Sequence, residues 1–400
     1  MRIKKLWLLI SVLVIAAMLA SACQSAKPTT KELTFGILMV GPYNDHGWSE
    51  AHYVAGQYVE QKIPGTKMIY LDKVNSADRP GTTESQLAEE LVSKGAKLII
   101  FNSDAMQAEA IKFAEAHPDI YVIHASGDSE WKDGKNYKPL KNFIDIMGRM
   151  EYGKMIAGCA AAMTTQTGKI GYLGPLINDE TRRLASSVYL GAKYCWTKYL
   201  NKDPKALSLK VTWIGFWFNI PGVTSDPTQV ADDFFNSGYD VVISGIDTTE
   251  GLTEAKKMSG AGKKVWAIPY DYVGGCKEAT DVCLGVPYFN WGPAYVQNIK
   301  SAMDGKWKDH FEWNPPDWKN INNPDTSAMG FEKGAALSTD ASTTVDKFIA
   351  ELAGGLNLWK GPLNLQDGTA YLKQGEVATD KQIWYLPQLL EGMEGQSVSQ

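Results

Sequence analysis

The sequence has few residues of the kinds on which catalysis and metal binding most often depend. Five histidines and five cysteines occur among 400 residues, and no Cys/His spacing in the chain suggests a metal site. A G-x-S-x-G elbow, an H-E-x-x-H helix and a Walker A loop are all absent. Since no nucleophile is paired with a base, we expect no enzymatic activity and neither a metal nor another cofactor.

Positive charge is not in excess, because 40 Lys and Arg residues stand against 45 Asp and Glu residues, for a formal net charge of −5. A basic patch of the kind that binds nucleic acid is missing, which argues against a nucleic-acid partner. Aromatic residues are plentiful instead, with 13 tryptophans and 18 tyrosines. Trp and Tyr offer large flat faces, so this composition favours a protein whose cleft stacks flat ligands.

The first residues carry the pattern of an exported, lipid-anchored protein. Basic residues are followed by an apolar run over residues 6–19, and small residues stand directly before Cys23. The run is shorter than the ~20 residues that a membrane-spanning helix needs, which favours a cleaved signal over an uncleaved anchor. We therefore expect a lipoprotein signal peptide at 1–22, a lipidated Cys23 with a tether at 23–32, and a location on the extracytoplasmic face of the membrane.

Four further cysteines would lie outside the cytoplasm, where disulfides are permitted. Cys276 and Cys283 flank a short polar segment and are candidates for closing a small loop. Cys159 and Cys195 fall in apolar stretches with helical patterns, so we expect both to be buried free thiols.

Short β-branched runs alternate with helical stretches, and after residue 150 the pattern starts again. The runs are nearly continuous in apolar residues, as in parallel sheets that are covered on both faces. We therefore predict an α/β protein with two doubly wound parallel-sheet lobes joined by a multi-strand hinge. The expected parts are 33–147 with 272–303 for the N-terminal lobe, 148–271 with 304–360 for the C-terminal lobe, and 361–400 as a C-terminal wrap.

Ligands of open α/β sheets bind beyond the carboxyl ends of the strands, so the residues that follow each strand are the first candidates. After the first strand come Asn44 and Asp45, which can cap the next helix or accept a ligand hydrogen bond, and Trp48. By itself, Trp48 is equally compatible with stacking on a ligand and with packing between the lobes. Other polar residues at predicted strand ends are Ser103, Asp104, Asp247 and Asp271, where a helix N-cap is the alternative role, above all for Asp104 and Asp247.

Several of these segments together resemble the BMP (basic membrane protein) family of substrate-binding lipoproteins of ABC transporters, which includes purine nucleoside receptors. The resemblance covers nearly all of the chain after Cys23 and implies the type I periplasmic-binding-protein fold. The matching segments are Asn44-Asp45-His46-Gly47-Trp48, Gly171-Tyr172-Leu173-Gly174, Phe216-Trp217-Phe218-Asn219, Gly245-Ile246-Asp247-Thr248-Thr249, Pro269-Tyr270-Asp271, Asn290-Trp291-Gly292-Pro293, Asp304-Gly305-Lys306-Trp307 and Lys360-Gly361-Pro362.

The resemblance also implies roles for individual residues. Trp48 and Trp217 match the two aromatic residues that sandwich the purine, and Asp271 matches the carboxylate that holds the ribose. Nucleoside-binding members carry a basic residue where this chain has Asn290 and Trp291, so the sequence is closer to a subgroup suited to a bare base such as adenine. The implied ligand-binding set is Trp48, Trp217, Asp45, Asn44, Asp271, Asp247, Ser103, Trp291 and Asn290.

The expected function is therefore capture of a purine, with a nucleobase favoured over a nucleoside, for delivery to ABC permease subunits. We expect a monomer held at the membrane by its lipid. Two alternatives remain at this point. One is a ligand-sensing or adhesion lipoprotein that signals to a membrane partner, and the other is a sugar receptor of the same fold.

Overall fold

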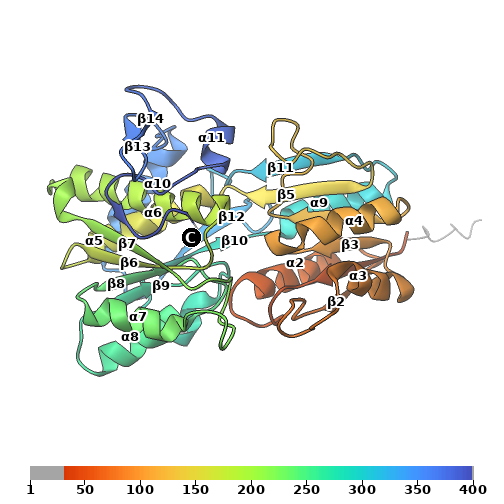
Figure 1. Ribbon diagram of the computed structural model, residues 1–400, viewed down its shortest axis with the longest axis horizontal. Helices are drawn as coiled ribbons and strands as arrows, with labels where there is room; N and C mark the ends of the chain where they lie inside the picture. Colours follow the sequence, from red (N-terminus) through yellow and green to blue (C-terminus); the bar gives the residue numbers. More distant parts are fainter. Residues whose placement is uncertain (1–30, 399–400) are drawn as a thin grey trace, which may run out of the picture. The chain divides into compact units, whose positions relative to one another are not determined.

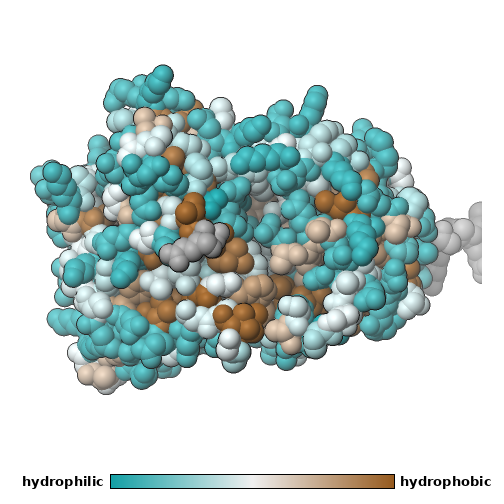
Figure 2. All heavy atoms as spheres, viewed as in Figure 1, coloured by the Kyte–Doolittle hydropathy of each residue, from teal (hydrophilic) through white to brown (hydrophobic). Residues whose placement is uncertain are grey.

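The computed structural model describes residues 31–398 (Figure 1). The expected signal peptide at 1–22, the lipidated Cys23 and most of the tether fall outside these residues. Within the described part of the chain, no helix combines the length and apolar character needed to cross a membrane. Figure 2 shows one face of the molecule, on which hydrophilic side chains predominate and apolar ones gather near the centre of the view.

The N-terminal lobe is built on a parallel sheet of six strands in the order β11-β5-β4-β3-β1-β2. Its central strand β3 is apolar and fully buried, as a strand covered on both faces must be. The strands are β1 (Leu33–Leu38), β2 (Thr66–Leu71), β3 (Leu98–Phe101), β4 (Tyr121–Ala125), β5 (Phe143–Gly148) and β11 (His310–Asn314). The helices of this lobe are α2 (Trp48–Lys62), α3 (Glu84–Ser93), α4 (Gln107–Ala116) and α9 (Gly292–Met303), with the 3-10 turn η1 (Asp104–Met106) (Figure 1).

The C-terminal lobe repeats this design with five parallel strands in the order β15-β7-β6-β8-β9. The strands are β6 (Lys169–Gly174), β7 (Ser208–Trp213), β8 (Val241–Ser244), β9 (Trp266–Ile268) and β15 (Met393–Glu394). Its helices are α5 (Met150–Thr164), α6 (Asp179–Lys198), α7 (Pro227–Asn236), α8 (Glu250–Gly260) and α10 (Thr339–Ala353), with the 3-10 turns η2 (Pro204–Ala206) and η3 (Gly275–Glu278). The predicted pair of parallel doubly wound sheets is confirmed.

Between the lobes, β10 (Gly285–Phe289) and β12 (Met329–Lys333) pair antiparallel and carry the chain across. A third connection runs from β5 directly into α5. One expected boundary is wrong, because residues 304–360 were assigned to the C-terminal lobe, whereas β11 pairs with β5 in the N-terminal sheet. Helix α9 leads into this strand, but the strand itself is short and carries polar residues (His310, Glu312 and Asn314), so the sequence gives little sign of its partner.

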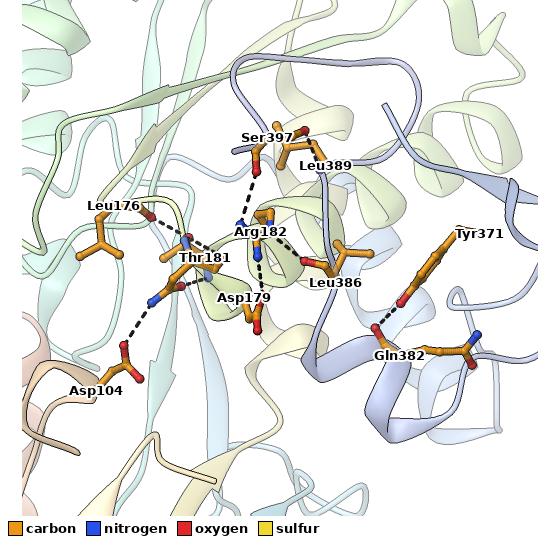
Figure 3. Close-up of polar contacts among 11 residues, drawn as sticks. Asp104, Leu176, Asp179, Thr181, Arg182, Tyr371, Gln382, Leu386, Leu389 and Ser397 are labelled. Atoms are coloured by element: carbon orange, nitrogen blue, oxygen red, sulfur yellow. Dashed lines mark hydrogen bonds and ion pairs between the residues drawn. The ribbon is translucent and has the colours of Figure 1, made fainter. Parts of the chain in front are cut away.

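The last residues form the hairpin β13 (Leu363–Asn364) and β14 (Ala370–Leu372), the short helix α11 (Asp380–Trp384) and strand β15. Arg182 on α6 fixes this segment, because its guanidinium donates to the carbonyls of Leu386 and Ser397 and pairs with Asp179 (Figure 3). The same segment also reaches the N-terminal lobe, where Tyr385 stacks on Trp131 with ring centroids 5.8 Å apart. The C-terminal residues therefore contact both lobes.

Two disulfides are present, of which one was expected. Cys276 and Cys283 are bonded, which confirms the small loop. Cys159 and Cys195 are also bonded, with their Cα atoms 5.3 Å apart, so the expectation of free thiols is wrong. The reason lies in the packing of α5 against α6. A Cβ added at Gly158 would lie 2.0 Å from the carbonyl oxygen of Val188, and this close approach brings the two cysteines together.

We expect the Cys159–Cys195 bond to stabilise the protein more than the smaller loop does. The bond joins residues 36 apart and restricts the unfolded chain, whereas the second loop spans 7. Replacing both Cys159 and Cys195 with Ala should lower the free energy of unfolding by about 3–4 kcal/mol, against about 2 kcal/mol for the Cys276→Ala, Cys283→Ala control. Urea unfolding measures both values, and equal losses, or free thiols at Cys159 and Cys195 in the purified protein, would contradict this account.

Candidate functional site

A cavity lies between the two lobes at the carboxyl ends of their strands. Each lobe contributes four of its lining residues, and each of these stands shortly after a strand, where a doubly wound sheet places its ligand site. The lining residues are Trp48, Ser103, Asp104 and Ser126 from the N-terminal lobe, and Glu180, Trp217, Asp247 and Tyr270 from the C-terminal lobe.

Trp48 opens helix α2 and is held firmly in place. Its indole N–H donates to the carbonyl of Asn102 at 2.5 Å, and its ring meets Phe289 and Trp291 edge-on, each at 5.3 Å between centroids. Trp291 in turn stacks on His52 at 4.5 Å. Trp291 therefore does not line the cavity, and instead supports Trp48 from behind.

Trp217 stands in the loop after β7, on the opposite lobe. Its carbonyl accepts the backbone N–H of Asp247 at 2.9 Å, which ties two cavity-lining residues together. Its indole N–H is buried and has no hydrogen-bond partner in the protein. An unpaired buried donor costs free energy, so a ligand that accepts this hydrogen bond would gain affinity.

The charged side chains on the cavity wall are all acidic: Asp104, Glu180 and Asp247. Burial raises the pKa of Glu180 to about 7, and burial likewise raises that of Asp247 well above its ordinary value. Asp271 follows Tyr270 and is completely buried. Neither of its oxygens has a hydrogen-bond partner, although the nearby Tyr270 hydroxyl offsets part of the rise in its pKa that burial causes.

One buried cation faces these acids. The ammonium group of Lys154 donates to the carbonyl of Ser244 at 2.8 Å and lies 3.0 Å from the centre of the Tyr270 ring. Burial lowers the pKa of Lys154 well below its ordinary value, and the charge of Asp271 acts in the opposite direction. Lys154 does not line the cavity. It lies against the Tyr270 ring instead, behind the acidic wall.

The loop that carries Ser103 rests on a buried pair. His124 Nδ1 lies 3.0 Å from Asp145 Oδ1, and His124 Nε2 lies 2.9 Å from the carbonyl oxygen of Ser103. Both ring nitrogens thus face acceptors, and hydrogen bonds to Asp145 and Ser103 raise the pKa of the imidazole despite its burial. Through these two contacts the ring fixes the Ser103 carbonyl just after the end of β3.

The two lobes touch beside the cavity. A Cβ added at Gly47 would lie 1.7 Å from the carbonyl oxygen of Asp247, so only glycine permits this contact. His46 Nε2 lies 3.5 Å from Glu278 Oε1, and the Asn178 amide donates to Asp104 at 3.2 Å, joining the start of α6 to the N-terminal lobe (Figure 3). The structure is therefore a closed form of the cleft.

Of the nine residues predicted to bind ligand, four line the cavity: Trp48, Ser103, Trp217 and Asp247. Asp271 is buried beside it. The Asp45 carboxylate instead caps helix α2 by accepting the backbone N–H groups of Gly47, Ser49 and Glu50, each at 2.9 Å. Asn44 is exposed at the surface.

Asn290 also points away from the cavity, because its amide donates to the carbonyls of Pro324 and Ser327. Three lining residues, Ser126, Glu180 and Tyr270, were not among the sequence-based candidates. Each follows a predicted strand, so the strand-end rule could have found them. Ser126 and Asp271 have positive backbone φ angles of 69° and 71°, and strained backbone of this kind gathers at functional sites.

We expect the empty protein to lose stability as pH rises from about 5 to about 7.5. The pKa of Glu180 rises from 4.5 in a free side chain to about 7 in the folded protein. Between these two pKa values the folded state holds a proton that the unfolded state has lost. At low pH this difference contributes at most about 3 kcal/mol to the free energy of unfolding. Thermal melting of ligand-free protein should show the decline, and Glu180→Gln should reduce its slope, whereas Glu115→Gln at the surface should not. A stability that rises with pH over this window would contradict the buried acidic wall.

Comparison with known proteins agrees with this geometry. The model of the Bmp family, described as ABC transporter substrate-binding protein PnrA-like, matches residues 33–313. A purine-binding protein of Brucella abortus is 27% identical over 92% of this chain and 95% of its own length. A putative ABC transporter glucose-binding protein of Haloferax volcanii is 26% identical over 68% of this chain and 62% of its own length.

Solved structures extend the comparison to the fold. An ABC transporter solute-binding protein of Aeropyrum pernix aligns over 83% of this chain and 93% of its own with a TM-score of 0.64 at 13% identity. One from Conexibacter woesei aligns over 81% and 97% with a TM-score of 0.59 at 14% identity. These likenesses confirm the type I periplasmic-binding-protein fold. With the family match covering both lobes, the chain belongs to the PnrA-like (Bmp) family of ABC transporter substrate-binding proteins.

Proposed function

We propose that the chain captures a purine nucleobase, such as adenine, between Trp48 and Trp217 and presents it to an ABC permease. The observation that carries the proposal is the cavity itself, with one tryptophan contributed by each lobe and polar residues between them. A flat ring held between two indoles gains about 1–3 kcal/mol for each stacked face. The purine-binding relative from Brucella abortus supports the same ligand class.

One feature favours a bare base over a nucleoside. Asn290 and Trp291, which stand where nucleoside-binding members carry a basic residue, are both engaged with other parts of the protein. No positively charged side chain therefore approaches the cavity from that segment to hold a sugar.

A sugar receptor remains the second candidate because one relative is named as a glucose-binding protein. The cavity wall has three acids, two serines and a tyrosine but no Arg, Lys, Asn or Gln side chain, so it offers few strong donors to the oxygens of a sugar. A sensing or adhesion role would involve the same closure of the lobes. Co-purification of the protein with a permease would distinguish transport from such a role.

The test is calorimetric titration of ligand-free protein with adenine, adenosine, guanosine and glucose. We expect adenine to bind most tightly and Trp217→Ala to weaken it about 5- to 150-fold, the loss of one stacked face. Trp48→Ala should weaken it at least as much. Trp266→Ala, on β9 at the end of the strand away from the cavity, is the matched control and should leave the affinity unchanged. Tight glucose binding, or adenine binding that survives both cavity variants, would contradict the proposal.

We further propose that Cys23 carries a lipid that holds the protein at the membrane, on the basis of the small residues that precede it. The full chain made in bacteria should incorporate labelled palmitate and fractionate with membranes. Cys23→Ala should lose both the label and the membrane association. A Cys23→Ala chain that still takes up label would mean that another residue is modified, and an unlabelled parent chain would exclude the anchor.

A further inference from the structure

The charged side chains that line the cavity are all acidic. Asp104, Glu180 and Asp247 line it, and Asp271 lies buried next to Tyr270. Two buried cations lie nearby: Lys154 donates to the Ser244 carbonyl, and Arg183 Nε pairs with Glu151 at 2.7 Å while its Nη2 has no partner. Neither cation lines the cavity. Among the side chains that a ligand would meet there, every ionisable group other than Tyr270 is a carboxyl.

Buried carboxyl groups at the cavity wall need hydrogen-bond donors. A carboxylate removed from water is costly unless N–H or O–H groups donate to it. Within the protein, Asp271 has no hydrogen-bond partner for either oxygen. Asp104 receives one hydrogen bond, from the Asn178 amide. Asp271 does not line the cavity, whereas Asp104 does. A carboxylate can accept about four hydrogen bonds, so Asp104 has acceptor capacity to spare, which a ligand with hydrogen-bond donors can use.

The wall also offers two neutral donors. The Trp217 indole N–H and the Tyr270 hydroxyl are both buried, both line the cavity and both lack a partner. Weak neutral donors suit the unprotonated ring nitrogens of a heterocycle. A ligand with amino groups on its edge and bare nitrogens in its ring would satisfy both kinds of group.

We infer that the site selects amino-substituted purines over oxo-substituted purines of the same size, and that Asp247, Glu180 and Asp104 determine this choice. The inference rests on the proposed function and specifies its ligand. An ionised carboxylate only accepts hydrogen bonds, so a carbonyl oxygen directed at these groups in their ionised form would leave them unpaired. Discrimination by a polar site exceeds what an apolar pocket achieves, because the penalty is an unpaired buried group rather than a lost contact.

The experiment compares rings of equal shape. Ligand-free protein at about pH 7.5, above the pKa of about 7 that burial gives Glu180, is titrated with adenine, diaminopurine, hypoxanthine and xanthine in a calorimeter. We expect adenine and diaminopurine to bind at least about tenfold more tightly than hypoxanthine, with xanthine weaker still. Hypoxanthine or xanthine binding as tightly as adenine would overturn the inference and leave the proposed purine receptor standing. Failure of every purine to bind would overturn both.

Variants identify the residues responsible. Asp247→Asn and Glu180→Gln each replace an acceptor oxygen with an amide that also donates, so each should reduce the ratio of adenine to hypoxanthine affinity at least about tenfold. Asp340→Asn, at an exposed position on α10, is the control and should leave the ratio unchanged. Two cavity variants are used so that loss of folding in one still leaves the other. Ratios unchanged in the folded cavity variants would contradict the assignment of these residues.

Discussion

Parallel strands that end at a common edge are the constraint on which the rest of this structure depends. Both sheets are parallel, and both turn their carboxyl ends toward the same cleft, so the residues after each strand meet there whatever their separation in sequence. This is how Trp48 and Trp217 come to line one cavity from opposite lobes. The three hinge connections then allow the lobes to move as units without changing the residues that each presents.

A layer of buried groups behind the cavity fixes the lining side chains in position. Trp291 and His52 stack behind Trp48, and the His124–Asp145 pair holds the loop that carries Ser103. On the other lobe, Lys154 lies over the Tyr270 ring. Because these supports are already formed, the binding side chains need little further ordering, and less of the ligand's interaction energy is spent on it. The acidic side chains of the cavity wall can still accept hydrogen bonds. A ligand with hydrogen-bond donors would supply them when the lobes are closed.

The sequence predicted the fold because the alternation of strands and helices is a local pattern that survives without tertiary information. It also placed Ser103 and Asp247 at the cavity from the strand ends, whereas Trp48 and Trp217 were assigned to the ligand through the family resemblance. It could not tell which way a strand-end side chain points, so Asn44 is at the surface and Asp45 is used as a helix cap. The Cys159–Cys195 bond and the place of β11 depend on which elements pack together, and neither has a local signal.

The central claim is that one flat ring lies between Trp48 and Trp217, with its donors on the acidic wall. A crystal structure of the protein with adenine tests this most directly, because it locates the ring and its edge together. The account predicts the ring stacked between the two indoles, with its amino group within hydrogen-bond distance of Asp104, Glu180 or Asp247. Adenine bound outside this cavity, or a cleft in which one tryptophan is turned away from the ring, would contradict it.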